Sequence, residues 1–386
     1  MSISFCLIVR NEAKNLEKAL RSVEPVADEV IVTDTGSTDD TVETARKFGA
    51  KISYFKWCDD FSAARNYNFS QARGDWIFYI DADEEFLPES SDELRRCLSK
   101  ENVFAWLVLR RDLTDLSRPN LYTEMWLPRL FRNHEDIHFA GRIHEHFQPS
   151  LYELAAGRGQ IAECSSIRIR HYGYAGTSIK EKLPRGVKLL ELELEERPGQ
   201  LYYQVELYRT LLLAGDNRWQ NVLNEAVENL LRFIDDEKSP TPQAALLIET
   251  LLQMPENKLP AKITSSQLPE IAQRWFPMSA PLLWVLAKQD YEHNRFESAE
   301  AKLRRLIQMG KENSYDKSVG FDPRIIGGEA KLNLAVCLIR QTMLKEATEI
   351  LESLSKTEEF HLAAEQNLSA IKRIRMGFSP KRPKRR

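Results

Sequence analysis

Residues Trp76 to Glu85 read Trp-Ile-Phe-Tyr-Ile-Asp-Ala-Asp-Glu-Glu, a run of aromatic and β-branched residues that stops at two aspartates. The apolar run predicts a buried strand. In an open α/β sheet, ligands bind just beyond the carboxyl ends of the strands, and Asp81 and Asp83 would lie there. Two carboxylates one residue apart suit a hard divalent cation that also holds substrate phosphates. The alternative is a solvated turn after a strand.

Strand and helix patterns alternate before this stretch. Strands are predicted at Ile3–Val9, Glu29–Thr33 and Lys51–Phe55, and helices at Asn15–Val23, from the 34–40 turn to Phe48, and at Phe61–Arg73. Such alternation implies parallel pairing through right-handed crossovers. The fold class predicted for this part of the chain is therefore α/β, with a Rossmann-like sheet.

The pattern is less regular between residues 102 and 174, where helices look sparse. Strands are predicted at Val103–Arg110, Met125–Arg132, Arg142–Phe147 and Ile167–Tyr172. We expect them to add antiparallel strands to the sheet edge, which makes the sheet mixed. Helical periodicity returns from Ser178 to Glu196 and closes at Pro198-Gly199. The first domain is therefore predicted to span residues 1–198.

Residues 199–375 are nearly all helical in pattern and contain an internal echo. Leu286, Ala287, Phe296, Ala299, Leu303 and Leu306 recur in the same order as Leu334, Ala335, Leu344, Ala347, Leu351 and Leu354. Small residues where two helices cross, and large residues along the contact between the helices, predict stacked helix hairpins. The spacing exceeds the ~34 residues of a tetratricopeptide (TPR) unit, so the segment from Gly310 to Gly328 is interpreted as an insertion. The alternative is an ordinary helical bundle.

Composition narrows the class of protein. A chain of 386 residues is long for one domain, and a net charge of −3 gives no global argument for nucleic acid or an anionic membrane. The five cysteines show no Cys-x-x-Cys spacing, which fits a reducing compartment. The strand at the start leaves no room for a signal peptide, and no apolar run approaches the ~20 residues of a membrane span. We expect a cytoplasmic protein. Its last residues, 376–386, are predicted to form a basic disordered tail, which is either a solvated end or a site for an acidic partner.

Several short motifs, in this order, resemble the family 2 glycosyltransferases of the GT-A fold. They are Ile8-Val9-Arg10-Asn11-Glu12, Val32-Thr33-Asp34-Thr35-Gly36-Ser37-Thr38-Asp39, Ala64-Arg65-Asn66, Gly74-Asp75-Trp76 and Asp81-Ala82-Asp83. The resemblance is clearest from Ser2 to Asp83 and fades towards Tyr174. The segments Arg142–Glu145 and His171–Tyr174, with the helical tail, are similar to bacterial enzymes that glycosylate peptides or envelope sugars.

The resemblance implies a metal-dependent, inverting glycosyltransferase. Its donor would be a nucleotide-diphosphate sugar, expected to be a UDP-sugar, its cation Mn²⁺ or Mg²⁺, and its acceptor a peptide, protein or envelope glycan. Asp83 would bind the metal, and Asp81 the metal or the ribose. The remaining residues implied in nucleotide-sugar binding are Arg10, Asn11, Glu12, Asp34, Arg65 and Ala82.

Each of these assignments has an alternative. Asp34 would read the nucleobase, or it caps the following turn. Arg65 would reach the base or a phosphate, or it is a surface arginine. Glu12 would flank the site, or it is an acid favoured at a helix start. His171 would supply a further metal or phosphate contact, or it is a histidine satisfied within the protein.

An inverting transfer needs a base within hydrogen-bond reach of the acceptor. The candidates are Glu145, favoured by resemblance, and His144. If residues 142–147 form a strand, His144 and His146 lie on one face and Glu145 on the other. A second hypothesis for the whole chain is a helical-repeat adaptor with a catalytically silent nucleotide-binding domain. In either case the helical domain could bind a protein partner or self-associate.

Overall fold

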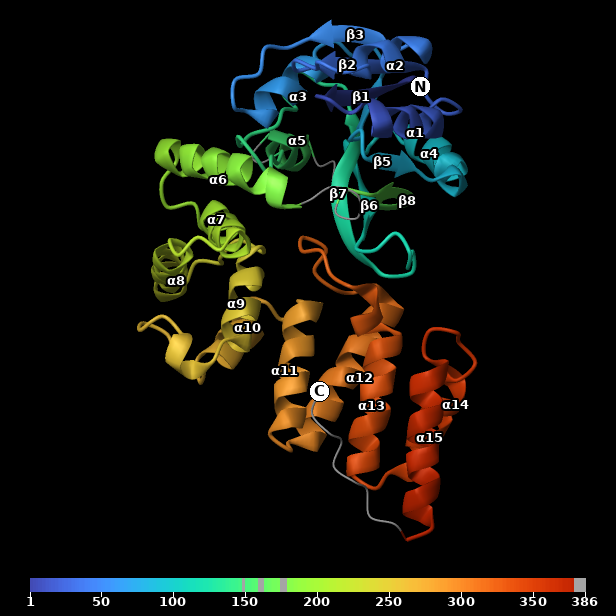
Figure 1. Cartoon of the computed structure of the whole chain (residues 1–386), viewed down its shortest axis with the longest axis vertical. Helices are drawn as coiled ribbons and strands as arrows, with labels where there is room; N and C mark the ends of the chain where they lie inside the picture. Colours follow the sequence, from blue (N-terminus) through green and yellow to red (C-terminus); the bar gives the residue numbers. More distant parts are fainter. Residues whose placement is uncertain (148–149, 159–162, 174–178, 378–386) are drawn as a thin grey trace. The chain divides into compact units, whose positions relative to one another are not determined.

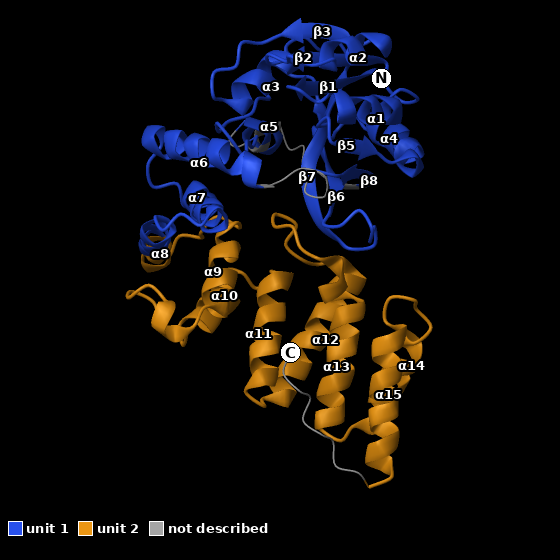
Figure 2. Cartoon of the chain, viewed as in Figure 1, with its two compact units in different colours: residues 1–229 blue, residues 230–386 orange. Residues whose placement is uncertain are grey.

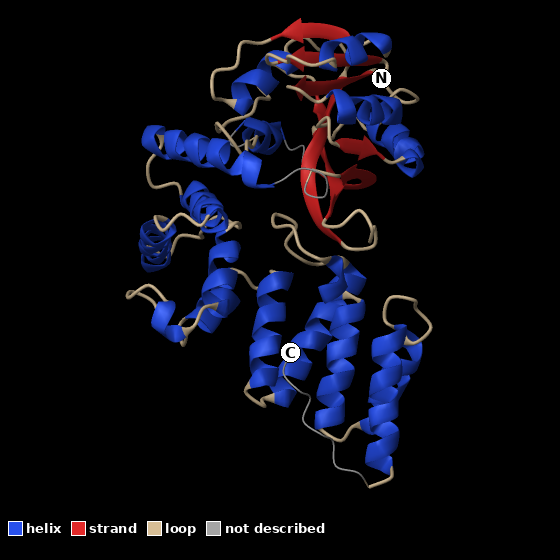
Figure 3. Ribbon diagram, viewed as in Figure 1, coloured by secondary structure: helices blue, strands red, loops and turns tan. Residues whose placement is uncertain are grey.

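The computed structural model describes residues 1–147, 150–158, 163–173 and 179–377. Packing divides the chain into two compact units, Met1–Asn229 and Leu230–Arg386 (Figure 2). Among the described residues, strands occur in the first unit only (Figure 3). The predicted fold class, a mixed α/β domain followed by helices, is confirmed.

The first unit is built on one mixed sheet of eight strands in the order β3-β2-β1-β4-β7-β6-β8-β5 (Figure 1). The strands are β1 (Ile3–Val9), β2 (Glu29–Asp34), β3 (Lys51–Tyr54), β4 (Trp76–Tyr79), β5 (Glu84–Phe86), β6 (Ala105–Leu113), β7 (Tyr122–Arg132) and β8 (Glu163–His171). β1 pairs in parallel with β2 and β4, and β2 with β3. β7 is antiparallel to β4 and β6, β8 is parallel to β6, and β5 is antiparallel to β8. The expected antiparallel additions are therefore present.

Helices surround this sheet and extend from it. They are α1 (Ala13–Val23), α2 (Thr41–Lys47), α3 (Phe61–Phe69), the 3₁₀ turn η1 (Pro88–Ser90), α4 (Ser91–Leu98), α5 (Ser150–Arg158), α6 (Ile179–Glu196), α7 (Leu201–Ala214) and α8 (Trp219–Asp235). α3 begins where the sequence predicts, because Asp60 Oδ1 accepts a hydrogen bond from Ala63 N at 2.9 Å. It ends at Phe69, short of the predicted Arg73. α4, α5 and β5 were not predicted.

The central strands are buried on both faces. Phe5, Leu7, Trp76 and Phe78 are wholly inaccessible to solvent, and the rings of Phe5 and Phe78 stack with centroids 4.9 Å apart. Burying each such side chain contributes about 1.5–3 kcal/mol. This core fixes the carboxyl ends of β1, β2 and β4, where the candidate site residues follow.

The predicted strand at Arg142–Phe147 is wrong. This segment is a series of bends with one isolated bridge, between Ala140 and His146. Gly141 has φ of 96° and His144 has φ of 50°, and neither angle is compatible with an extended strand. The expected alternation of His144, Glu145 and His146 across two faces therefore does not apply.

The second unit is helical throughout its described part. Its elements are α9 (Ala244–Gln253), η2 (Glu256–Lys258), α10 (Leu268–Trp275), α11 (Ala280–Glu292), α12 (Phe296–Glu312), η3 (Pro323–Ile326), α13 (Gly328–Arg340), α14 (Leu344–Leu354) and α15 (His361–Arg375). The echo in the sequence corresponds to two hairpins, α11–α12 and α13–α14. The segment interpreted as an insertion, from Gly310 to Gly328, lies between them and carries η3. Residues 378–386 of the predicted basic tail lie outside the described residues.

Helices α6 and α7 belong to the first unit. Leu190 packs with Tyr203, Leu207 and Leu211 in one apolar cluster, which ties the two helices together. The predicted end of the first domain at residue 198 stays a prediction, since packing divides the chain within α8. None of the helices in the described ranges combines the length and apolar composition needed to cross a membrane.

Candidate functional site

The turn after β4 holds the Asp-x-Asp motif in a fixed position. Asp81 N donates to Glu84 Oε2 at 2.9 Å, and Tyr172 N donates to Asp83 O at 2.9 Å. Ala82 is buried between them, with 5% of its surface exposed. The glutamate side chain is itself inaccessible to solvent. Hydrogen bonds to the backbone of both aspartates therefore fix the positions from which their side chains extend.

Asp81 lies between two arginines. Its Oδ1 accepts a hydrogen bond from Arg65 Nη2 at 2.7 Å, and its Oδ2 lies 3.5 Å from Arg129 Nη2. Burial by itself would raise the pKa of Asp81, but Arg65 and then Arg129 outweigh it and hold the pKa well below its usual range. Asp81 is therefore a carboxylate whose charge is already balanced by the protein.

Arg129 is a buried cation that the sequence analysis missed. Its side chain is 2% exposed, it lies 4.1 Å from the ring centre of Tyr79, and its Nη2 is 2.7 Å from Glu84 Oε1. Arg65 approaches the same ring at 5.0 Å. A signal for Arg129 was present, because a charged residue inside the apolar run of a strand needs a buried partner.

Asp83 faces a histidine. His171 Nε2 lies 3.5 Å from Asp83 Oδ2, while its Nδ1 is 2.8 Å from Asp112 Oδ1. Burial opposes a charge on His171, but hydrogen bonds to Asp112 and Asp83 outweigh burial and raise its pKa to about 9. Asp112 is in turn held by Arg110 at 2.7 Å. The ring of His171 is thus oriented with Nε2 towards Asp83.

These two side chains fit a divalent cation. A Cβ on Gly173 would come within 2.5 Å of both Asp83 Oδ2 and His171 Nε2, so the missing side chain keeps that space open. A carboxylate with an imidazole whose other nitrogen is held by a second carboxylate is a common metal-binding arrangement. With a pKa of about 9, His171 carries a proton on Nε2 at neutral pH, and a cation would bind by displacing it. In the described part of the chain, no three His, Cys, Asp or Glu side chains form a metal-binding group. A bound phosphate or water would supply further ligands.

The β1–α1 and β2–α2 loops are joined through hydrogen bonds. Asn11, with φ of 56°, donates from its backbone to Ser37 Oγ at 2.9 Å and accepts from Thr38 N at 2.8 Å. Asp34 is 5% exposed and accepts from Gly36 N and Ser37 N at 3.0–3.1 Å. The capping alternative for Asp34 is thus seen in the structure. Oδ2 accepts from both backbone groups, whereas Oδ1 accepts from Ser37 N, so a lone pair remains on Oδ1 for a ligand.

Glu12 completes the acidic side of the site, and Arg10 before it is exposed. Glu12 Oε2 accepts from Asn15 Nδ2 at 2.9 Å. Burial raises the pKa of Glu12, the bond from Asn15 opposes this, and the nearby carboxylate of Asp83 raises it further. The structure therefore brings Glu12 into the electrostatic neighbourhood of Asp83.

The two candidate bases point to different neighbours. Arg65 Nε donates to Glu145 Oε1, so the arginine that holds Asp81 also holds Glu145, whose side chain is 13% exposed. His144 is 40% exposed, and its Nε2 lies 3.7 Å from Glu206 Oε2 on α7. The structure thus gathers Asp81, Arg65 and Glu145 into one cluster and turns His144 towards α7.

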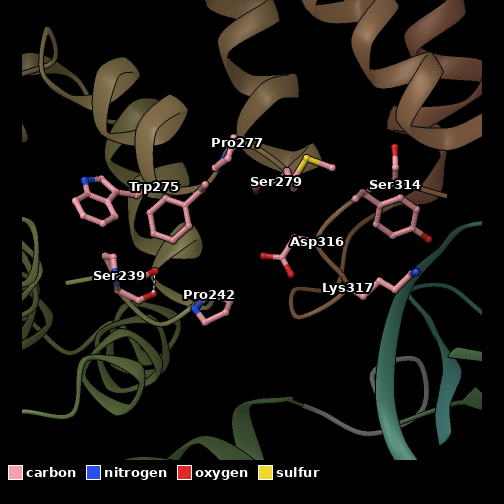
Figure 4. Close-up of a pocket in the computed structure, with 12 residues that line it drawn as sticks. Ser239, Pro242, Trp275, Pro277, Ser279, Ser314, Asp316 and Lys317 are labelled. Atoms are coloured by element: carbon pink, nitrogen blue, oxygen red, sulfur yellow. Dashed lines mark hydrogen bonds between the residues drawn. The ribbon is translucent and has the colours of Figure 1, made fainter. Parts of the chain in front are cut away.

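The second unit contains a separate cavity of about 570 Å³. Its lining includes Trp275, Phe276 and Tyr315 as well as the charged Asp316 and Lys317. Figure 4 shows these side chains around an open space, with Ser239 and Pro242 on one side and Ser314 and Lys317 on another. The cavity is aromatic with a charged rim, unlike the acidic site of the first unit.

Comparisons with known proteins find one family match, which lies within the first unit, and several relatives. The family model described as glycosyl transferase family 2 matches residues 4–150. An uncharacterized glycosyltransferase of Rickettsia felis is 30% identical over 255 residues, which are 60% of this chain and 88% of that protein.

Two further relatives are longer than the matched region. A TPR repeat-containing protein of Synechococcus elongatus is 39% identical over 56% of this chain and 55% of its own length. The prophage-derived glycosyltransferase SunS of Bacillus subtilis is 30% identical over 65% of this chain and 59% of its own length. The chain therefore spans little more than half of these two relatives. Among solved structures, S. aureus TarS aligns with a TM-score of 0.37 and 15% identity, covering 64% of this chain and 86% of that chain.

Proposed function

Because the chain belongs to the family 2 glycosyltransferases, we propose that it moves a sugar from a UDP-sugar donor to an acceptor with inversion, using Mn²⁺ or Mg²⁺. The family resemblance read from the sequence is confirmed by these matches. The donor, the metal, the acceptor and the stereochemistry are the proposal. The observation that carries it is the pairing of Asp83 Oδ2 with His171 Nε2 at 3.5 Å across the space left by Gly173.

Asp83 and His171 would hold the cation. A bound divalent cation would neutralise the charge that develops on the departing diphosphate. Asp81, balanced by Arg65 and Arg129, is proposed to accept a hydrogen bond from the ribose. Asp34 is proposed to accept one from the N–H of the nucleobase with a lone pair that Gly36 and Ser37 leave free.

The acceptor would lose its proton to Glu145. This side chain is held by Arg65, which also contacts Asp81, so one guanidinium would orient the base relative to the donor. A base must lie within hydrogen-bond reach of the attacking atom, and a fixed carboxylate meets that need better than a mobile one. Arg65 is accordingly proposed as a positioning residue. His144 is the second candidate base, with Glu206 beside it.

The second unit is proposed to bind the acceptor. Stacked hairpins present surfaces suited to extended partners, and the cavity lined by Trp275, Tyr315 and Asp316 offers aromatic and charged contacts. These features support a peptide or protein acceptor over an envelope glycan.

The proposal is tested by measuring how fast the protein releases UDP from each of a panel of UDP-sugars, in the presence of Mn²⁺, of Mg²⁺ or of EDTA. Asp83→Asn and His171→Ala should abolish metal-stimulated release, while Asp92→Asn, whose side chain is 96% exposed, should match the wild type. Should no UDP-sugar be turned over or raise the melting temperature with metal present, the proposal fails. If Asp83→Asn retains the cellular role, the adaptor hypothesis is favoured.

A further inference from the structure

Three of the four cationic residues of helix α6, Lys182, Arg185 and Lys188, follow one another at intervals of three residues, which places them along neighbouring turns. Lys182 Nζ lies 3.9 Å from Asp83 Oδ2. The Arg185 guanidinium lies 5.4 Å from the ring centre of Phe61 at the start of α3. Lys188 Nζ lies 2.6 Å from Asp59 Oδ2. The cationic side of α6 therefore faces the end of the sheet that carries the candidate site.

The three cations differ in how well their charge is balanced. The carboxylate of Asp59 lies close to Lys188 and balances its positive charge. Lys182 is 47% exposed and its contact with Asp83 is long, so this ion pair is weak. A metal bound at Asp83 would compete with it directly.

Arg185 is in the least favourable setting. Arg185 as a whole is exposed, but partial burial of its charged group lowers its pKa first, and the nearby positive charge of Arg10 lowers it further, with Glu12 acting in the opposite direction. Two guanidinium groups close enough to repel each other beside a single carboxylate form a site that an anion would stabilise. Arg10, Lys182 and Arg185 are thus cations on the rim of an acidic metal site.

We propose that Lys182 and Arg185 bind the diphosphate of the nucleotide-sugar donor from α6, while Asp83 and His171 hold its cation from the sheet. This inference rests on the proposed function, because it requires a donor with a diphosphate. A site for a metal–diphosphate complex needs acidic side chains that bind the metal and cationic side chains that bind the phosphate oxygens. An arginine fork and a lysine ammonium both match phosphate oxygens.

The same contacts would favour the reaction. The bond between the anomeric carbon and the diphosphate oxygen breaks, and its electron pair stays on the diphosphate. The acceptor atom bonds to the anomeric carbon and gives its proton to the base. Since negative charge on the diphosphate grows during this step, Lys182 and Arg185 would bind the transition state more strongly than the donor.

The experiment measures binding of UDP, UMP and uridine to the full chain by calorimetry with Mn²⁺. Lys182→Ala and Arg185→Ala should each weaken UDP binding about tenfold or more, since hydrogen bonds between charged groups are being removed. UMP and uridine should change less than twofold. Lys188→Ala is the matched control on the same helix and should bind UDP as the wild type does. Circular dichroism melting checks that each variant is folded.

The outcomes separate this inference from the proposed function. If the double variant Lys182→Ala/Arg185→Ala binds UDP as tightly as the wild type, the inference is wrong and the glycosyltransferase proposal stands. If the variants lose affinity for UDP and for UMP by the same factor, α6 does not recognise the diphosphate. If the wild type binds no uridine nucleotide with Mn²⁺, the proposed function fails, and this inference with it.

Discussion

Arg65 Nη2 and Asp81 Oδ1 lie 2.7 Å apart, and the same guanidinium donates from Nε to Glu145. One buried cation therefore joins an acid at the end of β4 to the candidate base in the 141–147 loop. The donor side and the acceptor side of the proposed reaction share a counter-ion. Replacing it would disturb both.

Arg65→Met is expected to lower turnover by about 100-fold or more, the usual contribution of a well-placed general base. Without the guanidinium, Asp81 keeps only its longer contact with Arg129, and Glu145 loses the partner that orients it. Arg65→Lys should recover part of the rate. Turnover in Arg65→Met close to that of the wild type would show that Arg65 does not position the base.

Arg129→Met should destabilise the first unit by about 3–5 kcal/mol, because it removes the closer of two cations from the buried Glu84 and leaves Arg110, whose Nη1 lies 3.8 Å from Glu84 Oε1. Burial already raises the pKa of Glu84 against the pull of Arg129. Adding Glu84→Gln to Arg129→Met should restore most of the loss, since the uncompensated charge is removed. Urea unfolding at neutral pH measures both effects. Equal stability of Arg129→Met and the wild type would mean that the buried pair contributes nothing.

The parts of this molecule that could be predicted from sequence are those set by local pattern. Ile3–Val9 is a strand with the predicted ends. A short apolar run rich in β-branched residues is typical of a central strand buried on both faces. The same pattern misled at residues 142–147. Ile143 and Phe147 look like an alternating strand, but Gly141 and His144 adopt positive φ, and nothing in local spacing reveals that.

The sequence predicts Asp81, Asp83, Arg65 and His171 as candidate site residues, but it does not reveal Arg129, Glu84 and Asp112, which contact them. Asp81 and Asp83 follow the strand that positions them. The pairing of Arg129 with Glu84, by contrast, depends on β7 lying beside β4, a register that forms only in the folded sheet. Asp112 was missed for the same reason, since it contacts His171 only because β6 pairs with β8. Long-range pairing is therefore what the sequence analysis could not supply.

Gly173→Ala should remove metal stimulation while leaving the protein folded. Its Cβ would lie within 2.5 Å of Asp83 Oδ2 and His171 Nε2, in the space that the proposed cation needs. The concentration of Mn²⁺ for half-maximal UDP release should rise beyond the measurable range. Gly186→Ala in α6 is the control, because its Cβ would meet Thr210 Cγ2 at 3.5 Å, an ordinary contact. Normal Mn²⁺ dependence in Gly173→Ala would exclude this pair as the metal site.

Asp290 gives the second unit an acid-sensitive contribution to stability. Its side chain is 9% exposed and accepts from Lys302 Nζ at 2.6 Å and from Arg295 Nε at 2.8 Å. Burial opposes its charge, but the hydrogen bonds from Lys302, then Ser298 and Arg295, lower its pKa. A lowered pKa in the folded state stabilises the fold above the unfolded value, which is near 3.9. This contribution is lost as the pH falls through the folded value.

Asp290→Asn should therefore cost about 1.5–3 kcal/mol at pH 7, the value of hydrogen bonds to a charged group. The difference between variant and wild type should shrink as the pH falls below about 4, where the unfolded aspartate is protonated. Urea unfolding from pH 7 to pH 3 gives the two curves, and Asp316→Asn, at the cavity rim, serves as the comparison. A difference that stays constant with pH would assign the loss to packing, because only the ionised carboxylate can produce a pH-dependent gap.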